Sequence, residues 1–188
     1  MLQIEIAKRA DGVGVLRCTR EDGSVTWQKQ PKHGAHFALH DLTHYAVETA
    51  LGYSHGFFGL IAEGWEVEDT TGKGARGPLP PEAIEVEKIV GLFDSERVSG
   101  TLWTAEEFSQ FAPRTLTDSA IQQVRALRSA LFQQWAAVPP GEKLHLKFEP
   151  VPVTAVNWFD SAIDCCRTQP SAETAELDQL RMRANRQD

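Results

Sequence analysis

Histidines crowd into one short stretch of this chain, since five of its six histidines lie within 23 residues. Four side chains of this stretch recur at every fourth position: His36, His40, His44 and Glu48. On a helix they would form one stripe that drifts about 40° per step. Imidazoles and carboxylates are common ligands of divalent metal ions. The spacing therefore predicts a helix over residues 36–51 that carries a metal-binding face.

The acids near these histidines have no basic partner close to them in the sequence. Residues 33–63 contain three acidic residues and no Lys or Arg. A buried carboxylate is stable only when it is paired or bound to a metal. Either protonated imidazoles compensate Asp41 and Glu48, or neutral imidazoles share a divalent cation with carboxylates. The pair His40 and His44 favours the cation, because histidines at i and i+4 lie one turn apart on one face.

The segment His40-Asp41-Leu42-Thr43-His44 resembles the HExxH helix of zinc metallopeptidases, with Asp41 at the position of their general-base Glu. In the gluzincin branch, the third ligand is a Glu after eighteen further residues, and that position here is Glu63. The resemblance implies zinc held by His40, His44 and Glu63, with Asp41 as general base or orienting carboxylate. It also implies hydrolysis of an amide or ester, in a small-molecule or peptide substrate, by a metal-activated water.

The same five residues are also similar to the HDxxH motif of the coenzyme Q biosynthesis family, in which a Glu follows after eleven residues. That position here is Gly56, and the nearest acids are Glu48 and Glu63. Glu48 lies two turns beyond the first histidine of the motif, about 12 Å along the helix axis. We therefore expect Glu63, on a second helix, to complete the site and Glu48 to accept an N–H from a ligand imidazole. The alternative ligands are His36 and His55.

Apolar periodicity predicts strands at both ends of a helical block. The predicted strands form an N-terminal antiparallel meander over about 2–28 and a further strand near 143–149. The predicted helices cover about 36–51, 57–68, 81–93, 104–111 and 117–138, with two more after Asn157 and Ser171. Thr104 and Glu107 have the spacing of a capping box. The sequence thus predicts an α+β fold in which helices cover a small antiparallel sheet and the histidine-rich helix is buried.

Length and composition favour a single domain over residues 1–188, with 171–188 as a polar helix that frays. The net charge is -7 and no basic stripe is present, so we expect no nucleic-acid partner. We also expect no membrane span and a cytoplasmic location, because neither a long apolar run nor a signal-peptide pattern is present. A homo-oligomer is compatible with the sequence. The adjacent Cys165 and Cys166 are expected to be structural.

Two further features bear on function. The loop over residues 70–80 carries Lys73 and Arg76, which we consider as an anion contact or lid beside the site. The acids Glu82, Glu85 and Glu87 are interpreted as a solvated helix face. The competing hypothesis is a non-enzymatic binding or assembly protein, in which the His and acid cluster is structural and a hydrophobic ligand or partner covers the aromatic-rich helices.

Overall fold

A computed structural model describes residues 1–10, 14–29, 34–72 and 74–150 of the chain. All of these residues belong to one compact unit, Met1–Pro152. The helices expected after Asn157 and Ser171, and the pair of adjacent cysteines, lie outside the described residues.

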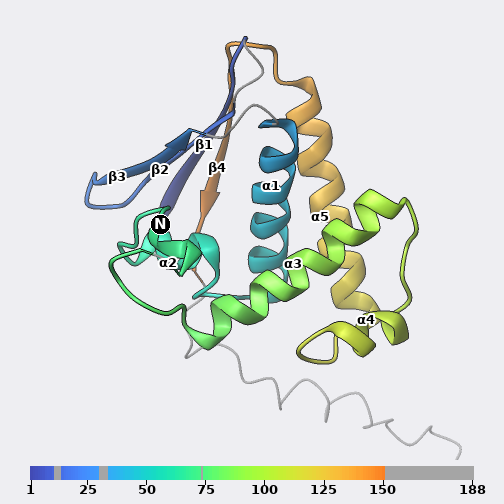
Figure 1. Ribbon diagram of the computed structural model, residues 1–188. Helices are drawn as coiled ribbons and strands as arrows, with labels where there is room; N and C mark the ends of the chain where they lie inside the picture. The colour runs from blue at the N-terminus through green and yellow to red at the C-terminus, as the bar shows by residue number, and fades with distance from the viewer. Residues whose placement is uncertain (11–13, 30–33, 73, 151–188) are drawn as a thin grey trace, which may run out of the picture. The chain divides into compact units, whose positions relative to one another are not determined.

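Four strands form one antiparallel sheet in the order β3-β2-β1-β4 (Figure 1). Alternation along the strands places apolar side chains on one face, where Ile4, Leu16 and Leu144 are buried. The opposite face carries Glu5, which forms ion pairs with Arg17 and Lys143 on its two neighbouring strands. The strands are β1 (Leu2–Lys8), β2 (Gly14–Thr19), β3 (Val25–Lys29) and β4 (Lys143–Phe148).

The histidine-rich helix α1 lies at the centre of the helical layer. It packs against β2 and against helices α2, α3 and α5, and Figure 1 shows α3 crossing it. Leu42, Ala46 and Val47 of α1 are fully buried. The predicted α+β fold with a buried histidine helix is therefore confirmed. The helices are α1 (Gly34–Leu51), α2 (Phe57–Ala62), the short 3-10 helix η1 (Asp69–Thr71), α3 (Pro81–Ser99), α4 (Ala105–Phe111) and α5 (Asp118–Ala137).

Helix boundaries follow local sequence at some ends and depart from the prediction at others. The capping box of Thr104 and Glu107 is present at the start of α4. Helix α2 ends at Ala62, earlier than predicted, because Gly64 takes a left-handed backbone with φ of 98°. Helix α3 continues to Ser99, beyond its predicted end. None of the described helices combines the length and the apolar character that crossing a membrane requires.

Candidate metal centre

Two histidines of α1 and one glutamate of α3 bring metal-ligating atoms together. His40, His44 and Glu87 each offer one ligand atom, and these three atoms lie within 4.8 Å of one another. The histidines are one turn apart on α1, and α3 packs across that face. Within the described residues this is the one group of three or more such side chains that could hold a metal ion.

His44 is the buried member of the group, with 2% of its side chain exposed. Its Nε2 lies 3.4 Å from Oε1 of Glu87, and its Nδ1 lies 3.4 Å from Oε1 of Glu48. The Nδ1 contact lacks hydrogen-bond alignment. Burial lowers the pKa of His44, but the two carboxylates outweigh that effect and raise the pKa to about 10. Without a metal, His44 is therefore an imidazolium between two carboxylates.

His40 is oriented by a carboxylate on the neighbouring helix. Its Nδ1 lies 2.8 Å from Oδ2 of Asp94, and Arg97 Nε donates to Oδ1 of the same carboxylate at 3.1 Å. Burial raises the pKa of Asp94, but His40 and Arg97 outweigh it and lower the pKa to about 2. Because Asp94 engages Nδ1, Nε2 is the nitrogen of His40 that is left to ligate. A carboxylate that orients a ligating histidine is a common feature of metal centres.

One side of the group opens to solvent. The side chains of Glu87 and His40 are 46% and 33% exposed, whereas the side chain of His44 is buried. If the three side chains held a metal ion, the accessible outer side would leave room for a further ligand from solution. That arrangement is typical of catalytic metal sites, whereas structural zinc sites are closed by four protein ligands.

Glu48 contacts both His44 and the polypeptide backbone. Its buried carboxylate accepts hydrogen bonds from the backbone N–H groups of Phe58 and Gly59, at 3.0 and 3.1 Å from Oε2. The chain passes so close that a Cβ on Gly56 would lie 2.5 Å from Cδ of Glu48. Glu48 thus holds the start of α2 while its other oxygen faces Nδ1 of His44.

Glu63, the expected third ligand, lies with a different histidine. Its Oε1 is 3.0 Å from Nε2 of His55, whose Nδ1 is 3.3 Å from Oε2 of Glu82. Helix α2 ends before Glu63, and the structure does not bring this carboxylate into the group with His40 and His44. The structure instead places Glu87 with His40 and His44. From the sequence, Glu87 was expected to belong to a solvated helix face. The spacing of Glu87 and Asp94, two turns apart on α3, is the pattern that could have indicated both residues.

Asp41, the expected general base, is buried and lies outside the group. Because Asp41 directly follows His40 in the sequence, its side chain is rotated by about 100° around α1. This rotation places it on the side of α1 that faces β2. Burial and the charge of Asp41 raise the pKa of the Cys18 thiol of β2 to about 12. The structure thus associates Asp41 with the sheet side of α1 and the histidine pair with the α3 side.

Two of the remaining candidate residues, His36 and Arg76, have partners of their own. His36 is exposed, and its Nδ1 lies 3.2 Å from a terminal nitrogen of Arg97. Arg76 donates to the carbonyl oxygen of Gly64 at 2.7 Å and lies over the ring of Trp65, 5.5 Å from its centre. Lys73 lies outside the described residues.

Comparison with known proteins gives no relative from which to transfer a role. No protein-family model, curated protein or solved structure matches this chain. The function is therefore inferred from the side chains of the site.

Proposed function

We propose that His40, His44 and Glu87 bind one divalent cation, zinc, through two imidazole nitrogens and one carboxylate. The proximity of the three ligand atoms supports this, since all lie within 4.8 Å of one another. The observation that carries the proposal is the contact of Asp94 with Nδ1 of His40, which fixes the ring and leaves Nε2 as the nitrogen that can ligate. Two histidines and one glutamate are also a known ligand set of catalytic zinc.

We further infer that the protein is a hydrolase of an amide or ester bond. The accessible side of the group, formed by the exposed parts of Glu87 and His40, supports this inference because a substrate could reach it. Zinc at such a site would polarise a carbonyl and lower the pKa of a bound water to about 7. His40 and His44 would hold the ion, and Asp94 would keep His40 in its ligating orientation.

The metal-binding step is tested by titrating zinc into chelator-treated protein by calorimetry, in two buffers of different ionisation enthalpy. We expect one equivalent of zinc to bind and about one proton to be released, because zinc must displace the proton of His44. His40→Ala and His44→Ala should abolish this binding. Wild-type protein that binds zinc no better than His44→Ala would contradict the proposal.

The hydrolase step is tested separately, on protein whose zinc content is known. A panel of 4-nitrophenyl esters and chromogenic peptide amides should be cleaved by the zinc-loaded protein and not by the chelated protein or by His40→Ala. If zinc binds with one-to-one stoichiometry and no member of the panel is cleaved faster than by His40→Ala, the hydrolase inference fails while the metal site stands.

A non-enzymatic assembly protein is the second candidate, and one observation favours it. His44 as an imidazolium lies within ion-pair distance of both Glu48 and Glu87, and such a cluster needs no metal. In that case zinc would leave the melting temperature unchanged, whereas a bound metal stabilises the folded state by mass action. Thermal melts of chelated and zinc-supplemented protein therefore separate the two candidates.

A further inference from the structure

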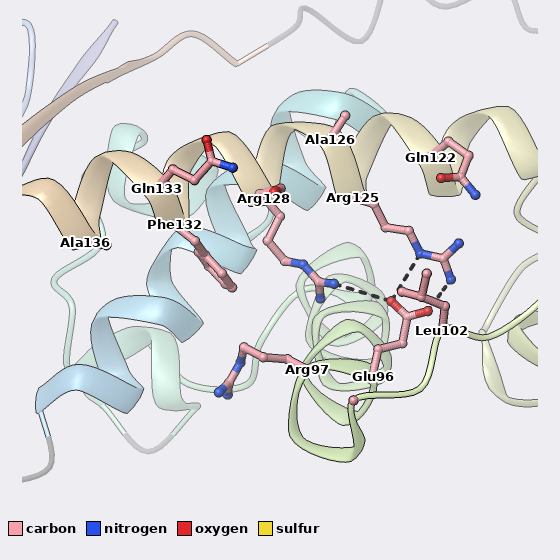
Figure 2. A pocket seen from close by; sticks show the side chains of 12 residues that line it. Glu96, Arg97, Leu102, Gln122, Arg125, Ala126, Arg128, Phe132, Gln133 and Ala136 are labelled. Atoms are coloured by element: carbon pink, nitrogen blue, oxygen red, sulfur yellow. Dashed lines mark hydrogen bonds and ion pairs between the residues drawn. The ribbon is translucent and has the colours of Figure 1, made fainter.

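A cavity lies between the end of α3, the α3–α4 connection and α5. Its volume is about 740 Å³, within the usual range of small-molecule sites. Figure 2 shows the side chains of Arg125, Arg128 and Phe132 pointing from α5 toward α3. Arg97 and Leu102 line the cavity from the opposite side. The lining thus combines the guanidinium groups of Arg125 and Arg128 with apolar surface.

One buried carboxylate balances only part of this charge. Glu96, 2% exposed, accepts hydrogen bonds from both Arg125 and Arg128. Its Oε1 also accepts from the backbone N–H of Trp103 at 2.8 Å. The third guanidinium, that of Arg97, bonds Asp94. Arg97 thus has its own acidic partner, whereas Arg125 and Arg128 share the single carboxylate of Glu96, in a protein whose net charge is -7.

The excess positive charge is held where water screens it weakly. The side chains of Arg125 and Arg128 are 12% and 10% exposed. Burial lowers the pKa of Arg128, and the neighbouring charges of Arg125 and Arg97 lower it further, against the opposing effects of Glu96 and Asp94. A second anion beside Glu96 would relieve this repulsion.

Hydrogen-bond donors for such an anion are present. Each guanidinium carries five N–H donors. Within the described residues, Arg125 donates three hydrogen bonds, and Arg128 donates two, one of them to the carbonyl oxygen of Phe93. A carboxylate suits the remaining donors, because guanidinium groups bind carboxylates with paired hydrogen bonds.

We propose that this cavity binds a small organic carboxylate with an aromatic or aliphatic body. The carboxylate is held by the arginines beside Glu96, and the body packs on Phe132 and Leu102. The alternative is that the arginines and Glu96 only link α3 to α5. That role would need no cavity lined by apolar side chains. The combination of a cavity of ligand size, apolar walls and more arginines than acids is what favours a ligand.

The probe for the test is 1-naphthoate, and its neutral match is naphthalene-1-carboxamide. Calorimetric titration of the whole chain should show saturable binding of 1-naphthoate, with the carboxamide at least about tenfold weaker, because charge-assisted hydrogen bonds are lost. Acetate, which has the charge without the body, should also bind more weakly. Equal affinities for the acid and the amide, or no binding of 1-naphthoate at millimolar concentration, would overturn the proposal.

Two matched variants of α5 locate the binding. Ala126 and Ala130 are both exposed, but only Ala126 lines the cavity. Ala126→Glu adds a carboxylate to the lining of the cavity, where it repels a bound anion, and should weaken 1-naphthoate binding by about tenfold or more. Ala130→Glu makes the same change of charge on the same helix and should bind as the wild type does. Similar melting temperatures exclude unfolding as the cause, and equal affinities of the two variants would contradict the assignment of the cavity.

Discussion

Asp94 of α3 and His40 of α1 join the two helices through a 2.8 Å contact between Oδ2 and Nδ1. This contact fixes the orientation of the His40 ring. Because Arg97 and Thr43 also contact the Asp94 carboxylate, the orienting group is itself fixed. The binding geometry of His40 is therefore a property of the packing of α1 against α3.

The first prediction concerns this orienting carboxylate. Asp94→Asn should weaken zinc binding by roughly 10 to 100-fold, the loss expected when a group that orients a metal ligand is changed. The measurement is competition with a chromogenic chelator. Asp118→Asn, on the exposed first turn of α5, is the control and should bind zinc normally. Equal zinc affinities of Asp94→Asn and the control would show that His40 does not need Asp94.

The second prediction separates the two candidate third ligands. Glu87→Gln should weaken zinc binding far more than Glu63→Gln, because Glu87 is the acid that lies with the histidine pair. Glu63→Gln removes the charge beside His55 and should leave zinc affinity near the wild-type value. Chelator competition on both variants gives the order. The reverse order would restore Glu63 as the ligand that the eighteen-residue spacing suggests.

The third prediction compares two glycines. Gly56→Ala should destabilise the protein by about 1–3 kcal/mol, because its Cβ would meet the buried carboxyl group of Glu48. Gly91→Ala, in the interior of α3 with nothing within 4 Å of the added Cβ, should stabilise it by about 0.5–1 kcal/mol. Urea unfolding measures both. If Gly56→Ala unfolds with the same free energy as the wild type, the Glu48 side chain can move without loss of stability.

The fourth prediction is a pH dependence that arises from Cys18. Burial, with the charge of Asp41, raises the pKa of this thiol from 9.0 to about 12. The unfolded chain therefore loses the thiol proton first, so this contribution to stability is complete below pH 9 and is lost as the pH rises toward 12. Urea unfolding at several pH values gives the free energy of unfolding of wild type and of Cys18→Ala. Above pH 9, the wild type should lose stability relative to Cys18→Ala. A difference that is constant with pH would contradict this.

Local patterns predicted the elements that position the site. The four-residue repeat of α1 and the capping box of α4 depend on contacts within a few residues, which the sequence displays directly. The alternation in β1 and β4 likewise indicated which face of each strand is buried. These predictions succeeded because each depends on the geometry of a single helix or strand.

The third candidate ligand is set by the packing of two helices, and spacing alone did not find it. Glu87 reaches His44 because α3 crosses α1 on the histidine side. The sequence contains several acids in α3, and nothing local distinguishes the one that faces α1. Asp41 was chosen by its place in a five-residue motif, yet its adjacency to His40 turns it to another side of the helix. Ligand identity therefore required the tertiary structure.

Helix α2 depends on α1 for its stability. It has six residues, fewer than the roughly 12–15 that an isolated helix needs in water, and Glu48 satisfies the N–H groups of Phe58 and Gly59 from the preceding helix. Folding must therefore order the α1–α2 segment as one cooperative unit. Hydrogen exchange at these two amides should occur only through opening events that also release the end of α1, so the side chain that faces the candidate metal ligand also couples the ordering of α2 to that of α1.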